Sequence, residues 1–357
     1  MTNTASLFEP VQLGELTLPN RLVMAPLTRC RAINHLPNDL MAEYYAQRAG
    51  AGLVITECTM VTAGTSAFGN DPGIYSPEQV EGWKKTTKAV HAAGGRIFMQ
   101  IWHGGRACHP LLNDGREAVA PSAIAIDGET NTPQGMKPYT VPHELTKEEI
   151  AAIVQDFRRA AANAIAAGFD GVEIHGANGY LIDQFLRDSA NRRSDEYGGS
   201  LENRARFLME VLEAVTGEIG SERVGLRLSP LNSFNSMQES DPVAWTRYLA
   251  GHVNRFGLAY LHLMRADFFG VQQADVVPIA REHYHGHLMV NMGYSAEEAA
   301  EVVRNEFADS VAFGTAFLAN PDLPARIKAG AALNTPDPDT FYTAGAEGYT
   351  DYPSMGA

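Results

Sequence analysis

The amino-acid sequence predicts an α/β fold, a (β/α)8 barrel, on three observations. Short apolar runs rich in strand-forming residues alternate with segments of helical periodicity, which is the pattern of a parallel sheet built from strand-helix units. Eight such runs occur, the number that closes a barrel. No Gly-x-Gly-x-x-Gly sequence follows any run, which counts against the competing open, doubly wound sheet. We therefore expect residues 1–357 to form one barrel domain.

Local composition gives the expected elements in chain order. The strands are expected at 21–25, 52–57, 96–101, 171–175, 224–229, 260–263, 287–292 and 310–313. The clearest helices are expected at 39–49, 76–93, 146–167, 200–219, 241–256 and 295–307. Several of these helices open with a serine, threonine or aspartate, which can cap the free amides of a first turn. Glycines stand where helices should stop, at positions 94, 95, 168, 220 and 257.

Two segments lie outside the strand-helix repeat. Residues 7–18 alternate around Gly14 and predict a small N-terminal hairpin that plugs the floor of the barrel. Residues 104–145, after the third strand, are rich in proline, glycine and asparagine. A loop of that length inside a compact domain is usually functional, so we expect it to cap the barrel mouth.

Composition and charge narrow the possible partners. The formal net charge is −14 and no run of lysine or arginine occurs, which disfavours nucleic acid and anionic membrane surfaces. Apolar stretches are too short to span a bilayer, and residues 1–10 show no signal peptide. Cys30, Cys58 and Cys108 give neither a disulfide framework nor a metal pattern. We expect a cytoplasmic protein that acts on small molecules, as a monomer or weak homodimer.

The functional groups of such a barrel gather at the carboxyl ends of its strands. Here those positions form a polar rim without a carboxylate pair or a serine-histidine-aspartate arrangement. Such a rim suits a planar cofactor rich in heteroatoms better than it suits hydrolysis. The candidate residues at the strand ends are Pro26, Thr28, Gln100, Trp102, His175, Asn178, Tyr180, Arg227, Met292, Gly293, Gly314 and Thr315.

Five segments in one continuous order carry a family resemblance. They are residues 20–29 (NRLVMAPLTR), the group of His175, Asn178 and Tyr180, and residues 189–200, 319–323 and 346–353. Together they resemble the old yellow enzyme family over nearly the whole chain. The resemblance implies a TIM barrel that binds FMN without a covalent link. It also implies that NADPH or NADH reduces the flavin and that an activated alkene reoxidises it.

The resemblance places five side chains at the flavin ring. Pro26 and Thr28 would lie against the isoalloxazine, with the threonine hydroxyl bonded to a flavin carbonyl; the alternative is a turn or cap hydroxyl. Gln100 and Arg227 would contact the pyrimidine edge, whose negative charge in reduced flavin a guanidinium stabilises. A structural salt bridge is the alternative for Arg227, although an unpaired buried arginine is costly. Cys58 stands where the family has a small residue near the flavin, with packing as its alternative.

His175 and Asn178 stand three residues apart across the end of the fourth strand, so both side chains can point into the mouth and donate to one acceptor oxygen. Donation to the carbonyl or nitro group of an unsaturated substrate draws electrons from its double bond and stabilises the developing enolate. The resemblance makes Tyr180 the general acid that protonates the α-carbon. A structural or metal-binding histidine, and a buried hydrogen-bonded tyrosine, are the alternatives.

Three aromatic residues are expected to shape the substrate cavity. Trp102 faces the same way as Gln100 along its strand, with a core aromatic as the alternative. Phe68 and Tyr349 stand where the family places aromatics over the site. The family often has tyrosine at the position of Phe68.

The expected phosphate pocket departs from the family. The family uses backbone amides after the seventh and eighth strands, together with an arginine directly after the glycine of the last strand. This chain has Met292-Gly293 and Gly314-Thr315 at those positions. The amides remain and the cation is missing, so we expect FMN to bind at reduced strength.

A histidine cluster, His283, His285 and His287, raises the question of a metal site. The cluster precedes the seventh strand, at the end of the barrel away from the expected site. We therefore interpret it as a solvated loop and expect no metal.

Together these observations predict an NAD(P)H-dependent flavin ene-reductase that reduces activated C=C bonds in enones, enals, maleimides and nitroalkenes. Two alternatives stay open. A metal-dependent barrel hydrolase would need a carboxylate or histidine cluster at strand ends, where only His103 and His175 are available. An FMN-binding protein with little turnover is the other, and Tyr180 argues against it.

Overall fold

The computed structural model of the chain describes residues 4–356; residues 1–3 and 357 of the expected domain lie outside the described residues. In the described part, eight parallel strands close into a barrel in the order β11-β12-β13-β14-β15-β3-β4-β6, and β6 pairs back to β11. They are β3 (Leu22–Met24), β4 (Leu53–Ile55), β6 (Ile97–Trp102), β11 (Gly171–Gly176), β12 (Val224–Leu228), β13 (Tyr260–Met264), β14 (Leu288–Asn291) and β15 (Ser310–Phe313). The predicted barrel is confirmed, with every strand end within two residues of its expected place.

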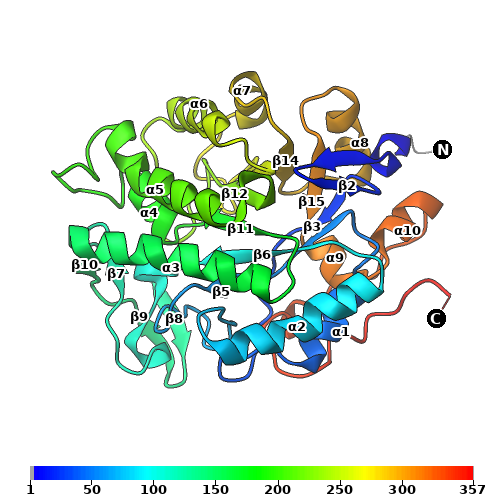
Figure 1. The fold of residues 1–357 in the computed structure, drawn as a ribbon, viewed down its shortest axis with the longest axis horizontal. Coiled ribbons are helices and arrows are strands. Elements are labelled where there is room, and N and C mark those ends of the chain that lie inside the picture. Colours follow the sequence, from blue (N-terminus) through cyan, green and yellow to red (C-terminus); the bar gives the residue numbers. More distant parts are fainter. Residues whose placement is uncertain (1–3, 357) are drawn as a thin grey trace.

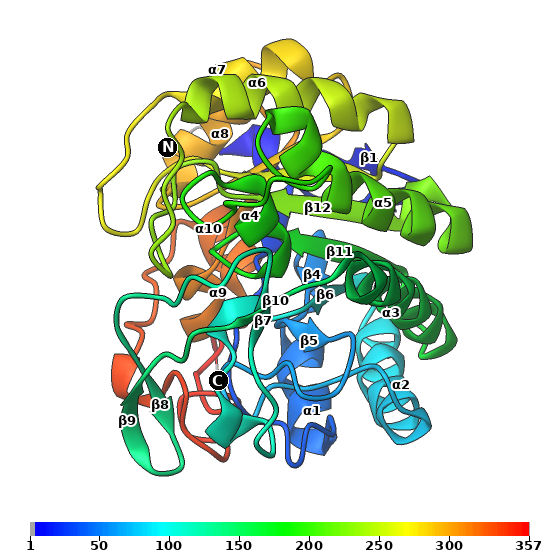
Figure 2. The same cartoon turned by 90° about the vertical axis from the view of Figure 1, so that its left-hand side faces the viewer.

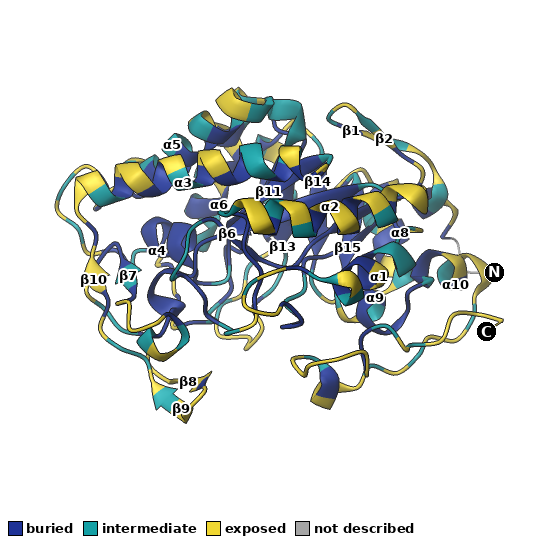
Figure 3. Ribbon diagram, turned by 60° about the horizontal axis from the view of Figure 1, so that its bottom comes forward, coloured by how far each residue is buried: buried dark blue, intermediate teal, exposed yellow. Residues whose placement is uncertain are grey.

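The predicted helices are present and pack around the barrel (Figure 1). They are α1 (Asp39–Gln47), α2 (Pro77–Ala92), α3 (Lys147–Ala166), α5 (Leu201–Ile219), α6 (Pro242–Val253) and α8 (Ala296–Arg304). Ser76, Thr146 and Ser295 form capping boxes at the starts of α2, α3 and α8. Figure 3 shows the result: exposed residues follow the outer faces of the helices, whereas the barrel strands are buried.

Four shorter helices were not among the clear expectations from sequence. They are α4 (Leu181–Leu186), α7 (Val276–His283), α9 (Thr315–Ala319) and α10 (Leu323–Ala329). Each has eight residues or fewer, which is too short to show a helical period in the sequence. Conversely, the helix expected over 295–307 ends at Arg304, because Glu306 adopts a left-handed conformation with φ +58°.

The N-terminal hairpin closes the floor of the barrel, as expected. It consists of β1 (Val11–Leu13) and β2 (Leu16–Leu18), which pair antiparallel around Gly14. A side chain at Gly14 would collide with the backbone carbonyl of Glu222, so glycine is required there. Leu13 and Leu18 join a buried apolar cluster with residues that point into the barrel from its strands: Val23, Ala25, Leu53, Ile55, Phe98, Tyr260, Met289 and Ala312.

The segment 104–145 contains more regular structure than a loop. It includes β7 (Val119–Ala120), an antiparallel hairpin of β8 (Glu129–Thr132) and β9 (Gly135–Pro138), and β10 (His143–Glu144), which pairs with β7. The hairpin projects from the body of the protein beside the C-terminal part of the chain (Figure 2). A short strand β5 (Thr59–Met60) extends the sheet beside the end of β6.

Barrel closure brings the two ends of the chain together. The Val311 amide donates to the Arg21 carbonyl, and the Ala25 amide donates to the Phe313 carbonyl, both at 3.0 Å. The segment after α10 then returns to the N-terminal half, where the Arg29 guanidinium donates to the Gly348 carbonyl at 2.6 Å. Within residues 4–356, no helix combines the length and apolar character that a membrane span requires.

Candidate functional site

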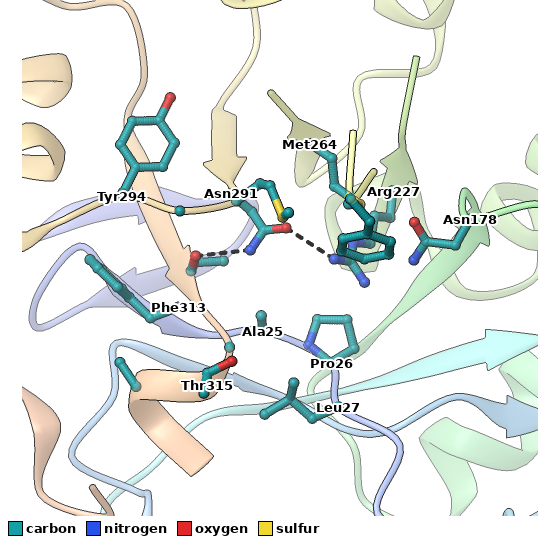
Figure 4. Close-up of a pocket in the computed structure, with 16 residues that line it drawn as sticks. Ala25, Pro26, Leu27, Asn178, Arg227, Met264, Asn291, Tyr294, Phe313 and Thr315 are labelled. Atoms are coloured by element: carbon teal, nitrogen blue, oxygen red, sulfur yellow. Dashed lines mark hydrogen bonds between the residues drawn. The ribbon is translucent and has the colours of Figure 1, made fainter. Parts of the chain in front are cut away.

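Two neighbouring cavities open at the carboxyl ends of the strands. The first measures about 360 Å³ and is shown in Figure 4; it is lined by Ala25, Pro26, Leu27, Asn178, Arg227, Met264, Phe268, Asn291, Met292, Gly293, Tyr294, Ala312, Phe313, Gly314, Thr315 and Ala316. The second measures about 430 Å³ and is lined by Cys30, Ala67, Phe68, Asn70, Ala107, Glu129, Thr130, Asn131, Tyr139, Tyr180, Phe234, Asn235 and Tyr342. Phe268 of the first and Phe234 of the second make an edge-to-face contact, with ring centroids 6.1 Å apart.

Arg227, on β12, is buried at the first cavity. Its Nη2 donates to the Asn291 side-chain oxygen at 3.0 Å, and the Asn291 amide donates to the Ala312 carbonyl at 3.1 Å (Figure 4). The Nε of Arg227 has no partner among the described residues. Burial lowers the pKa of Arg227, and the nearby Glu173 carboxyl opposes that shift. A buried guanidinium that is bonded to a neutral amide and keeps one unused N–H donor can bind an anionic ligand group.

A polar layer separates the first cavity from the apolar floor. Glu173, on β11, accepts 2.8 Å hydrogen bonds from the Gln100 amide and from His262 Nδ1. Burial raises the pKa of Glu173, but His262, Arg227 and Gln100 outweigh it, so the pKa is lowered and the group is a carboxylate. This buried negative charge balances part of the Arg227 charge. Gln100 is therefore engaged below the cavity and does not line it.

His175 is held as a neutral hydrogen-bond donor. Its Nδ1 accepts the Ala177 backbone N–H at 3.3 Å, which leaves the ring proton on Nε2. Burial, together with the positive charge of Arg227 and the nearby His262, lowers its pKa well below the usual histidine value. The ring thus stays uncharged at physiological pH and retains one N–H to donate.

Asn178 lines the first cavity in a fixed orientation. Its backbone is left-handed, with φ +58°, and its N–H donates to Ser229 Oγ at 2.8 Å. Its side-chain oxygen accepts from the Asn232 amide at 2.8 Å, so the other end of the amide, the NH2 group, remains free to donate. Figure 4 shows Asn178 beside Arg227.

Tyr180 links the histidine to the second cavity. Its ring is edge-to-face with His175 at 5.2 Å and with Trp102 at 5.1 Å. Burial raises the pKa of Tyr180 well above its usual value, so the phenol keeps its proton. Trp102 is fully buried, and Phe68 stands 6.2 Å from it, between Trp102 and Tyr342. The structure therefore brings His175, Tyr180, Trp102 and Phe68 together.

Tyr349 does not join this group, contrary to expectation. It is completely buried and stacks on Tyr44, with ring centroids 4.0 Å apart and the Arg29 guanidinium over its ring. It lines neither cavity. The C-terminal aromatic residue that lines the second cavity is Tyr342, which the sequence did not single out.

Thr28 and Cys58 contact one another and line neither cavity. Thr28 Oγ1 and Cys58 Sγ are 3.1 Å apart. In sequence, Thr28 follows Pro26 of the first cavity and precedes Cys30 of the second. Burial raises the pKa of the Cys58 thiol well above its usual value, which makes it a small inert residue beside the threonine.

The seventh and eighth strands end at the first cavity. Met292, Gly293, Gly314 and Thr315 all line it, as the sequence suggested. Met292 has φ +93° and Gly293 has φ +68°, so two successive residues are left-handed. Asn291 and Tyr294 were missed, although the inward alternation of β14 would have placed Asn291 beside the site.

Comparisons with known proteins agree with this geometry. A sequence profile of the NADH:flavin oxidoreductase / NADH oxidase family matches residues 6–334. A probable flavin mononucleotide-dependent alkene reductase of Leishmania infantum is 54% identical, over 98% of this chain and 97% of the relative. The chain belongs to the old yellow enzyme family. The old yellow enzyme from Trypanosoma cruzi superposes with a TM-score of 0.96 at 43% identity, over 99% of both chains. Morphinone reductase in complex with tetrahydroNAD gives 0.94 at 46% identity, over 98% of both.

The enzyme is accordingly a flavin oxidoreductase with FMN as its cofactor, and its site fits that group. The spare donor of Arg227 suits the ring edge that becomes negative on reduction. The Gly293 and Tyr294 amide N–H groups have no partner within residues 4–356, and both residues line the first cavity. Unpaired amides in a left-handed turn suit a phosphate.

The histidine cluster lies apart from these cavities. His287 contacts the Gln12 carbonyl at 3.0 Å and Ser310 Oγ at 2.8 Å, which joins the floor hairpin to the barrel. His283 ends α7. Within residues 4–356, no group of three or more histidine, cysteine, aspartate or glutamate side chains is arranged to hold a metal.

Proposed function

We propose that the enzyme uses NADPH or NADH to reduce C=C bonds activated by an adjacent carbonyl or nitro group, as in enones, enals, maleimides and nitroalkenes. The observation that best supports this proposal is the pair of donors at the end of β11. His175 keeps a proton on Nε2 and Asn178 keeps a free amide, three residues apart and beside Tyr180. Two neutral donors at the end of one strand suit a carbonyl or nitro oxygen.

Part of the expected cofactor set lines the first cavity. Pro26 and Arg227 would hold the ring of FMN from its wall. Thr28, with Cys58 packed behind it, and Gln100, which is bonded to Glu173, would contact the ring from positions outside that lining. The backbone at Met292, Gly293, Gly314 and Thr315 would hold its phosphate. FMN, when bound, would accept a hydride from the nicotinamide coenzyme and pass it to the substrate.

The proposed substrate residues lie in and around the second cavity: Tyr180, Phe68 and Tyr342 line it, Asn178 lines the first cavity, and His175 and Trp102 contact the Tyr180 ring. His175 and Asn178 would bind the activating oxygen and stabilise the negative charge that develops on it. Tyr180 would deliver its phenolic proton to the α-carbon, because it lines the cavity in its protonated form. Trp102, Phe68 and Tyr342 would shape the apolar walls.

The test is ligand binding by the purified holoenzyme. It should be yellow, and a para-substituted phenol should produce a long-wavelength charge-transfer band as it binds over the oxidised flavin. His175→Ala should weaken phenol binding and kcat/KM for alkenes, each by roughly tenfold to a hundredfold, the usual effect of losing a hydrogen bond to a charged partner. Because His175 stays neutral, phenol affinity should follow the ionisation of the phenol and show no inflection near pH 6.5.

His103→Asn is the matched control. His103 is also a buried histidine at a strand end whose Nδ1 accepts a backbone N–H, that of Gly105 at 3.0 Å, yet it lines a third cavity, together with Thr62 and Val119. This variant should bind phenol normally. Normal phenol binding by His175→Ala, or protein that fails to take up FMN, would overturn the proposed function.

A further inference from the structure

Arg265, the first residue after β13, is tied to the turn that follows β14. Its Nε donates to the Met292 carbonyl and its Nη2 to the Gly293 carbonyl, both at 2.8 Å. Its backbone N–H donates to the Asn291 carbonyl at 3.1 Å. Its guanidinium carbon lies 3.6 Å from the centroid of the Tyr294 ring. One side chain thus holds three consecutive residues of the turn.

The turn needs an external restraint. Met292 carries a side chain at φ +93° and Gly293 follows at φ +68°. A left-handed conformation is unfavourable for a residue with a side chain, and it persists only where its surroundings enforce it. Arg265 supplies that restraint by two charge-assisted hydrogen bonds.

The direction of these bonds determines where the amides point. In a trans peptide the C=O and the following N–H point in opposite directions. When Arg265 draws the Met292 and Gly293 carbonyls outward, the N–H groups of Gly293 and Tyr294 face away from Arg265. Those two residues line the first cavity and Arg265 does not, and both N–H groups lack partners among the described residues.

We propose that Arg265 is a positioning residue for the FMN phosphate. It fixes the amides of Gly293 and Tyr294 toward the phosphate and polarises them through their carbonyls, while its own charge remains outside the cavity. Arg265 thereby restores part of the affinity for the phosphate that is lost because Thr315 stands in place of an arginine. This inference rests on the proposed placement of the phosphate in the first cavity.

The inference is tested by stripping the holoenzyme of flavin and titrating the full chain with FMN and with riboflavin, which lacks the phosphate. Arg265→Met should weaken FMN binding about tenfold, as expected when a charge-assisted hydrogen bond is lost, and change riboflavin binding less than about twofold. Arg265→Lys keeps the charge and one donor group, so it should fall between Arg265→Met and the wild type.

Arg255→Met is the matched control. Arg255 also lies over an aromatic ring, that of Phe256 at 4.8 Å, and pairs with Glu213 at 3.2 Å, much as Arg265 pairs with Glu298 at 3.5 Å. It lies outside both cavities, so its loss should leave both flavins unaffected. In the Arg265→Met background, Met292→Gly should restore FMN affinity, because glycine adopts positive φ without restraint.

The outcomes separate the two levels of the proposal. Equal weakening of FMN and riboflavin by Arg265→Met, unchanged FMN affinity, or no rescue by Met292→Gly would each overturn the role of Arg265 and leave the proposed function standing. Wild-type protein that takes up neither flavin would overturn the proposed function, and this inference with it.

Discussion

Tyr180 stands at the meeting point of the aromatic and polar parts of the site. Its ring packs edge-to-face on Trp102 and His175, and burial keeps its phenol protonated. The ring of Tyr180 makes those contacts, whereas its hydroxyl would carry out the proposed chemistry. Substitution by phenylalanine separates the two, because the ring remains and only the proton donor is lost.

Tyr180→Phe should leave reduction of the flavin by NADPH or NADH nearly unchanged. Reduction of an enone should slow by at least about a hundredfold, the usual contribution of a positioned acid. A nitroalkene should be affected less, because its nitronate product is stable without protonation at carbon. Stopped-flow measurement of the two half-reactions gives both rates. Equal losses in both would make Tyr180 a structural residue.

At the scale of elements, Asp267 organises the loop between β13 and α7. It accepts hydrogen bonds from the backbone of Ser233, Phe269, Val271 and Gln272 and from the Ser233 hydroxyl. Burial raises the pKa of Asp267, but these donors outweigh it and the pKa is lowered. The bonds hold the loops after β12 and β13 together, and with them Phe268 and Phe234, one aromatic ring from each cavity.

Asp267→Asn should loosen this loop, because an amide replaces one acceptor oxygen by a donor that faces other donors. We expect faster hydrogen exchange at the Val271 and Gln272 amides and a severalfold increase in KM for the alkene. The overall stability should change little. Asp275→Asn is the control, since Asp275 precedes α7 without capping it by its side chain. Exchange rates that match in the two variants would contradict the assigned role.

The sequence was sufficient to locate the elements whose side chains repeat with a clear period, and it was insufficient to locate those without one. Alternation predicted that Gln100 and Trp102 lie on the same face of β6, because the side-chain period of a strand is strictly two. Tyr342 could not be found this way: it comes from an irregular segment whose path only tertiary contacts determine. The same contacts bury Tyr349, and spacing alone cannot distinguish two tyrosines in such a segment. The roles of the residues that were found stay predictions until they are tested.

For the whole molecule, buried neutral histidines predict acid sensitivity. Burial lowers the pKa of His103 to about 3 and that of His175 well below its usual value. The unfolded chain binds protons at these residues below about pH 6.5 and the folded chain does not. Each histidine should therefore reduce the free energy of unfolding by about 1.4 kcal/mol per pH unit as the pH falls below 6.5.

His103→Asn tests this sign, because the asparagine oxygen can still accept the Gly105 N–H but does not titrate. Denaturant unfolding at a series of pH values should show a shallower loss of stability between pH 6.5 and 4 in the variant. Glu57, whose pKa burial raises to about 7, contributes the opposite slope, so the difference between the two proteins isolates His103. Parallel profiles would show that His103 is protonated in the folded state.

The pairing of β15 with β3 also determines how late during synthesis on the ribosome the barrel can close. The hydrogen bond between Arg21 and Val311 joins residues 290 positions apart, so the first strand emerges long before its neighbour exists. At about 5–20 residues per second, this delay is roughly 15–60 seconds. During that interval the nascent chain exposes one apolar strand edge, and Arg29 has no Gly348 carbonyl to bind. Synthesis of β15, rather than of any earlier strand, is the event that allows the barrel to close.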